Sequence, residues 1–120
     1  MPRNDPPATI DRANVAHARK LLARERKQLP RMAMLYKLLA NEARLKILQI
    51  LSATEKMCVG DLAQVLELSN AATSQQLKML REHGWLRSSA NGKLVYYSLA
   101  EPGLADALAG DLVLLRQAGR

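Results

Sequence analysis

The most constraining feature of this 120-residue sequence is a change of hydrophobic period at Gly84. Before it, residues 58–84 have the apolar spacing of two helices, separated only by a short break at residues 67–70. After it, residues 85–99 alternate as two strands around Asn91-Gly92, which is a strong signal for a hairpin turn. The order predicts a helix-turn-helix followed by a β-hairpin wing.

Further helices are predicted on both sides of this motif. A basic helix at residues 10–29 forms an N-terminal arm, and Pro30 separates it from a short apolar helix at 32–40. Another helix covers residues 42–52, and the last covers 101–117. The expected fold class is therefore mainly α with a small β-hairpin, arranged as a winged helix-turn-helix.

Composition agrees with this fold class. The chain has one Trp, three Tyr and no Phe, so its core must be aliphatic, which suits packed helices better than a sheet sandwich. At this length we expect one domain, residues 10–120. Three prolines and polar neighbours in residues 1–9 predict a disordered tail before it.

The helix at 42–52 shows which side chains should form the core. Asn41 is suited to cap its N-terminus. An apolar stripe is expected to face inward: Leu45, Ile47, Leu48 and Leu51. Three polar side chains are expected to face outward: Arg44, Lys46 and Gln49.

Charge suggests a partner. The formal net charge is +7, and residues 1–31 carry +5 of it. An excess of basic residues fits binding to a polyanion such as nucleic acid. The alternative is that the basic arm only keeps the protein in solution.

The second helix of the helix-turn-helix has the composition of a DNA-reading element. Leu77 and Leu80 can anchor it to the core. The polar residues in and before its N-terminal half are Ser69, Asn70, Thr73, Ser74, Gln75, Gln76 and Lys78. This half enters the major groove in helix-turn-helix proteins, where Gln can pair with adenine. The alternative is an ordinary solvated helix face, but a wing that carries Arg87 and Lys93 favours DNA binding.

Four segments in order resemble the ArsR/SmtB family of winged helix-turn-helix repressors. They are LANEARLKIL at 39–48, CVGDLA at 58–63, TSQQLKMLREHG at 73–84 and GKLVYY at 92–97. The resemblance implies a homodimer that forms through the first and last helices and binds a double-stranded operator. It also implies repression that a chemical signal relieves. By the same resemblance, Arg87 and Lys93 contact the backbone. The groove and phosphate contacts that it implies are Ser69, Asn70, Thr73, Ser74, Gln75, Gln76 and Lys78.

Cys58 is the only thiol and a candidate sensor. It stands at the expected N-cap of a helix, a position that favours the thiolate, and Asp61 follows three residues later. In metal-sensing members of the family such a Cys-x-x-Asp pair supplies two ligands, and the partner's arm supplies others. Here His17 is the arm candidate, so Zn or another thiophilic metal ion could bind at Cys58, Asp61 and His17. The set is short of the four donors usual for zinc, and simple packing of Cys58 explains it about as well.

Several function classes are disfavoured. We expect no enzymatic activity, because no catalytic triad, phosphate-binding glycine loop or catalytic metal cluster is recognisable. A single cysteine and the absence of an apolar signal or membrane segment favour the cytoplasm. Two alternatives to an inducible repressor remain: a constitutive or partner-controlled DNA binder, and a protein–protein adaptor.

Overall fold

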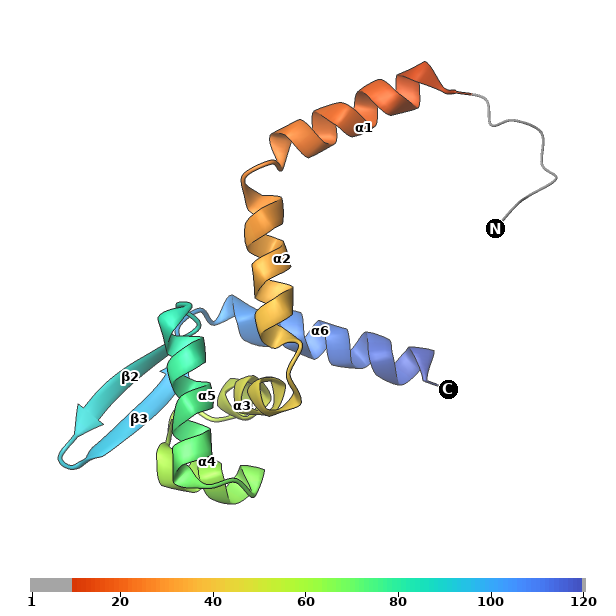
Figure 1. The fold of residues 1–120 in the computed structure, drawn as a ribbon. Coiled ribbons are helices and arrows are strands. Elements are labelled where there is room, and N and C mark those ends of the chain that lie inside the picture. The colour runs from red at the N-terminus through yellow and green to blue at the C-terminus, as the bar shows by residue number, and fades with distance from the viewer. Residues whose placement is uncertain (1–9, 120) are drawn as a thin grey trace. The chain divides into compact units, whose positions relative to one another are not determined.

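The computed structural model describes residues 10–119 and contains six helices and one three-stranded sheet in that range (Figure 1). The helices are α1 (Arg12–Arg24), α2 (Gln28–Leu39), α3 (Glu42–Ala53), α4 (Val59–Leu66), α5 (Asn70–Glu82) and α6 (Gly103–Ala118). The strands are β1 (Met57–Cys58), β2 (Leu86–Asn91) and β3 (Leu94–Leu99). The expected fold class, mainly α with a small hairpin, is confirmed. The predicted disordered tail at 1–9 lies outside the described residues.

The chain divides into two compact units, one ending at Lys37 and one beginning at Leu38. In the first unit the arm helix is shorter than expected, because α1 ends at Arg24 and a turn at 25–27 precedes α2. Pro30 does not separate the helices but lies in the first turn of α2. Proline is tolerated there, since a backbone N–H in the first turn has no partner within the helix.

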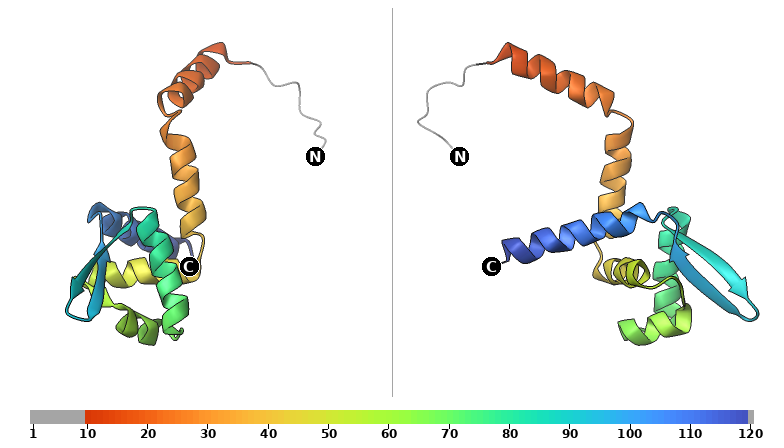
Figure 2. Two further views of the ribbon diagram at one scale, coloured as in Figure 1. Left: turned by 60° about the vertical axis from the view of Figure 1, so that its left-hand side comes forward. Right: turned by 180° about the vertical axis from the view of Figure 1, so that it is seen from behind.

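The second unit is built around an aliphatic core. Its buried members are Leu38, Ile47, Leu48, Leu51, Leu62, Leu77, Leu80 and Leu86. Asn41 caps α3 as predicted, and its side chain accepts a hydrogen bond from the backbone N–H of Arg44 at 3.0 Å. Helix α3 contacts α5, α6 and β3 and so forms the centre of the unit (Figure 2).

Helices α4 and α5 form the predicted helix-turn-helix. Helix α4 ends at Leu66, and its C-cap residue Glu67 adopts a left-handed conformation with φ 57°. Ser69 then caps α5 by accepting a hydrogen bond from the N–H of Ala72 at 3.0 Å. The two helices contact each other, and the buried Leu77 and Leu80 join α5 to the core as expected.

The wing contains one more strand than the sequence predicted. Strand β3 pairs antiparallel with β2 and also with β1, in the order β1-β3-β2. Strand β2 continues through Asn91, so the turn itself is Gly92-Lys93, and Gly92 has a φ of 66°. Glycine at the first central position suits a two-residue hairpin turn. Gly84, the predicted helix terminator, has a φ of 83°.

Helix α6 packs only one side against the core. Leu104 and Leu108 lie half-buried against the cluster, whereas Leu114 and Leu115 are exposed by 64% and 65% of their surface. Leu45 of α3 is also exposed and lines an apolar groove with Leu108, Leu112 and Leu115. None of the helices within 10–119 is long and apolar enough to span a membrane.

Candidate nucleic-acid interface

The N-terminal half of α5 presents a polar face to solvent. Asn70, Ser74, Gln75 and Lys78 are all exposed, while the buried Leu77 and Leu80 hold the same helix against the core. The face is therefore free to meet a ligand on a helix whose orientation is fixed. Lys78 Nζ lies 3.9 Å from Glu82 Oε1, but both groups are largely exposed. Such a pair is worth about 0.3–0.5 kcal/mol, so Lys78 can leave it cheaply for a phosphate.

Two of the predicted contact residues are buried or half-buried in the protein. Thr73 is fully buried, and its hydroxyl donates a hydrogen bond to the Ser69 carbonyl oxygen at 2.9 Å. Gln76 is half-buried, and its Oε1 accepts a hydrogen bond from Arg44 Nε at 2.9 Å. Thr73 has no free surface to offer a base in this state, and it therefore serves the packing of the helix start.

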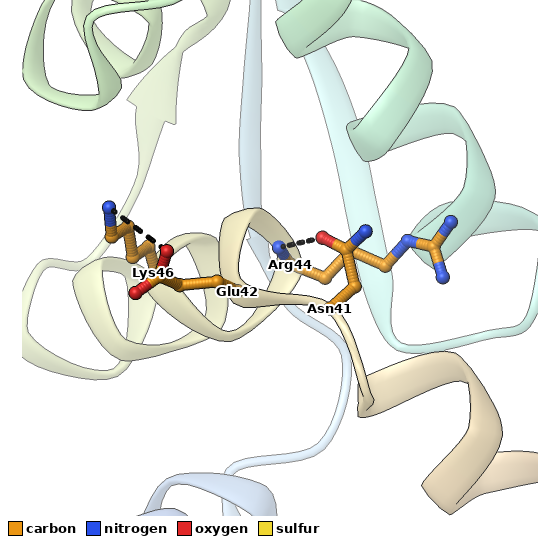
Figure 3. Close-up of polar contacts among 4 residues, drawn as sticks. All are labelled: Asn41, Glu42, Arg44 and Lys46. Atoms are coloured by element: carbon orange, nitrogen blue, oxygen red, sulfur yellow. Dashed lines mark hydrogen bonds and ion pairs between the residues drawn. The ribbon is translucent and has the colours of Figure 1, made fainter.

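The expectation that Arg44 faces solvent is wrong. The Glu42–Lys46 pair and the Arg44 side chain leave α3 on opposite sides (Figure 3). Lys46 and Gln49 are exposed as predicted, but Arg44 is half-buried. Its guanidinium donates to Gln76 on α5 and, through Nη1, to the Leu38 carbonyl oxygen at 3.0 Å. Sequence reasoning missed Arg44 as part of this site, since its spacing alone resembles that of a solvated residue.

The start of α5 adds a second feature suited to an anion. Ser69 satisfies one backbone N–H of the first turn, and the remaining N–H groups keep the positive end of the helix dipole. No acidic residue lies in this first turn. A phosphate at this helix end would meet no opposing carboxylate from the first turn.

The wing supplies cations on exposed backbone. Arg87 lies on β2 and Lys93 lies in the hairpin turn, and both are exposed. The register places Arg87 opposite Ser98 near the base of the hairpin. The two cations thus lie towards opposite ends of the hairpin.

The proposed metal donors are distributed over both units. Cys58 is the N-cap of α4 as predicted, is half-buried, and makes no side-chain capping hydrogen bond. Asp61 is exposed in the first turn of α4, and His17 is exposed on α1. No group of three His, Cys, Asp or Glu side chains within residues 10–119 is arranged to hold a metal. Cys58 and Asp61 alone are two donors, half of what a structural zinc site uses.

Comparison with known proteins identifies the family. Residues 41–88 match the family described as "Bacterial regulatory protein, arsR family". The cadmium resistance transcriptional regulatory protein CadC homolog of Staphylococcus aureus is 40% identical over 91 residues, which cover 75% of this chain and 73% of that one. The chain belongs to the ArsR family. It is accordingly a DNA-binding transcriptional regulator and not an enzyme.

Two other relatives illustrate the family's range. The arsenical resistance operon repressor of Escherichia coli is 42% identical over 66 residues, covering 55% of this chain and 56% of that protein. A solution structure of Mb0332 from Mycobacterium bovis, described as a homodimeric winged helix-turn-helix DNA-binding domain, matches with a TM-score of 0.69 and 26% identity. It covers 78% of this chain and 86% of the other. The winged helix-turn-helix prediction is thereby confirmed for this ArsR-family protein.

Proposed function

We propose that this ArsR-family protein is a homodimeric repressor that reads its operator with the N-terminal half of α5. The observation that carries the proposal is the exposed polar set Asn70, Ser74, Gln75 and Lys78 on a helix that Leu77 and Leu80 anchor. Gln76 adds its amide at the edge of this set. Ser69 Oγ is committed to the helix cap, so Ser69 serves DNA through the helix end that it stabilises. Arg87 and Lys93 of the wing bind phosphates beside the groove.

Exposed apolar side chains support a homodimer. Helices α1 and α6 bury no residue in the single chain. The apolar side chains most open to solvent on these helices and at the start of α1 are Ile10, Leu22, Val113, Leu114 and Leu115. A second copy would cover such surface, and the Mb0332 domain is described as homodimeric. Two copies would place two α5 helices on two half-sites, as a palindromic operator needs.

Duplex selection tests the DNA-binding proposal. The full chain is incubated with a pool of randomised duplexes, and bound sequences are compared with the input. We expect an inverted repeat, and affinity that falls steeply with salt, with a slope of about 0.9 per phosphate contact. Binding without sequence preference would contradict operator reading. No binding at low salt would favour the protein–protein adaptor.

The signal that releases the operator is proposed to act at Cys58. The support is indirect: two relatives are named for cadmium and arsenical resistance, and Cys58 is the one cysteine of this sequence. Cys58 occupies the N-cap position of α4 and pairs through its backbone with Tyr96, so a change at its sulfur would act on the helix-turn-helix and the wing together. The described residues do not complete a metal site around it, so the cytoplasmic signal is proposed as a thiol-directed agent, with Zn or another thiophilic ion as one member of that class.

Cys58→Ser separates signalling from folding. Serine is a better N-cap than cysteine, so we expect the variant to fold with stability equal to or about 0.5–1 kcal/mol above the parent. Operator release by Zn²⁺, Cd²⁺, arsenite or a disulfide reagent should be lost, while binding without these agents is kept. Fluorescence anisotropy with a selected duplex measures both. Unchanged release would sink the sensor role and favour a constitutive or partner-controlled DNA binder.

A matched test concerns the other two donors. Asp61→Asn and His17→Gln should weaken release by metal ions but leave release by a disulfide reagent unchanged, because only the sulfur reacts with the reagent. Equal effects of all three substitutions on metal release would support a shared site. If neither Asp61→Asn nor His17→Gln has any effect, the response rests on Cys58 alone.

A further inference from the structure

Arg44 links three elements at the edge of the DNA-reading face. Its backbone N–H is fixed by Asn41 Oδ1 at 3.0 Å (Figure 3). Its Nη1 donates to the Leu38 carbonyl oxygen at 3.0 Å, in the last turn of α2. Its Nε donates to Gln76 Oε1 at 2.9 Å, on α5. The guanidinium is therefore held at one end by backbone and orients a predicted contact residue at the other.

This contact determines which way the Gln76 amide faces. An arginine side chain has donors and no acceptor, so only the oxygen of the amide can face it. The Nε2 group, with its two N–H donors, is then directed away from the guanidinium. Paired recognition of adenine by Gln uses its oxygen as acceptor and its nitrogen as donor together. With one lone pair of Oε1 engaged by Arg44, the amide keeps both donors but only one free acceptor position.

The surroundings of Gln76 have the same polarity. Arg44, Gln75, Gln76 and Lys78 line one groove together with Met79 and Glu82. Glu82 is the one carboxylate of this lining, and it lies beside Lys78. Two cations stand against one carboxylate in this lining, so the groove offers N–H groups and a net positive charge to whatever enters it. Base edges with acceptors alone match this best: O6 and N7 of guanine, or O4 of thymine.

We propose that Arg44 is a positioning residue that fixes the donor side of Gln76, so that Gln76 reads an acceptor on a base edge instead of pairing with adenine. This inference rests on the proposed operator-reading function of α5. Arg44 itself does not touch the base. It acts because a guanidinium can donate in two directions at once, to Leu38 and to Gln76, whereas a lysine ammonium lacks this rigid fork.

Four variants of the full chain test the inference on duplexes selected by the parent protein. Arg44→Lys keeps the charge but loses the fork, and Gln76→Leu removes the amide. We expect each to reduce discrimination at one and the same base pair of each half-site by about tenfold. The double variant should be no worse than Gln76→Leu alone, because Arg44 acts through Gln76.

Gln76→Glu is the sharpest variant. Its carboxylate still accepts from Arg44, so the link is kept, but both donors are gone. We expect preserved thermal stability and a preference that moves at this base pair to a base carrying a donor, such as cytosine N4. This variant decides the matter even if Arg44→Lys fails to fold, which a thermal melt of each variant reports.

The outcomes distinguish failure of this inference about Arg44 and Gln76 from failure of the proposed operator-reading function. If the parent selects no sequence, the operator-reading proposal fails and this inference falls with it. If the parent is selective but Gln76→Glu keeps the same preference, the inference alone is wrong. A uniform loss of affinity on all duplexes in Arg44→Lys, or losses that multiply in the double variant, would instead make Arg44 a phosphate contact or a purely structural residue.

Discussion

Helices α1 and α5 are alike in length and in N-terminal capping but differ in how much of each is buried. Each has 13 residues, and each begins with a side-chain cap: Asp11 accepts from the N–H of Asn14, and Ser69 accepts from that of Ala72. Yet α5 buries Thr73, Leu77 and Leu80, while α1 buries nothing. Capping and spacing make both segments helical, but only burial makes α5 part of the cooperative fold. The apolar residues of α1 are available for a partner.

The prediction with the largest expected effect truncates one leucine to alanine in each helix. Leu80 is fully buried, so Leu80→Ala should lower the free energy of unfolding by about 2–5 kcal/mol. Leu22 is 58% exposed, so Leu22→Ala should change it by no more than about 0.5 kcal/mol in the monomer. Urea unfolding at several protein concentrations measures both. A loss of stability in Leu22→Ala that depends on protein concentration would place α1 in the dimer interface. A loss as large as that of Leu80→Ala at every concentration would contradict the difference in burial between α1 and α5.

The second test concerns what each polar face does. Gln75→Ala should reduce discrimination between the selected operator and a mismatched duplex by about 1–3 kcal/mol, because an exposed groove contact is lost. The matched change in α1, Lys20→Ala, removes a charge and should leave discrimination unchanged. Competition binding at fixed salt measures the ratio. A loss of discrimination in Lys20→Ala would show that the arm also reads sequence.

The prediction with the smallest expected effect compares the N-caps of α5 and α1. Ser69→Ala should cost about 1 kcal/mol of global stability, because α5 unfolds only with the core. Asp11→Ala breaks an equivalent hydrogen bond, but α1 can fray without exposing buried residues. We expect faster amide exchange in the first turn of α1 and an unchanged denaturant midpoint. A shifted midpoint would mean that α1 is cooperative with the rest.

The features that were predicted correctly from the sequence are those that depend on residues close together in the chain. The Asn41 cap, the change from helix to strand at Gly84 and the helix-turn-helix all depend on residues within one turn or break, and they are present. The turn at 25–27 was missed because it contains neither glycine nor proline to mark it. Instead the prediction used Pro30, which a first helical turn accommodates.

What the sequence did not reveal depends on distant pairing. Strand β1 is two residues long and exists only because Met57 and Cys58 pair with Tyr97 and Tyr96. Arg44 was expected to face solvent because its hydrogen-bond partner Gln76 is 32 positions away. The exposed face of α5 was predictable as a set, but which of its members are already engaged by the protein was not. Gln76 is engaged by the distant Arg44, and Thr73 is buried in the core.

Strand β1 supports only part of the β2–β3 hairpin and leaves its tip without a third strand. The middle of β3 is held on both sides, since Met57 and Cys58 pair with Tyr97 and Tyr96 on one side while β2 pairs along the other. Beyond Tyr96 the hairpin has only its own two strands, so bending is concentrated towards the tip at Gly92-Lys93. A force on the tip would be transmitted to the segment paired with β1, where Cys58 is also the N-cap of α4. Extra residues are therefore best tolerated at the tip, and the stiffness of the segment paired with β1 determines how strongly the wing is coupled to α4.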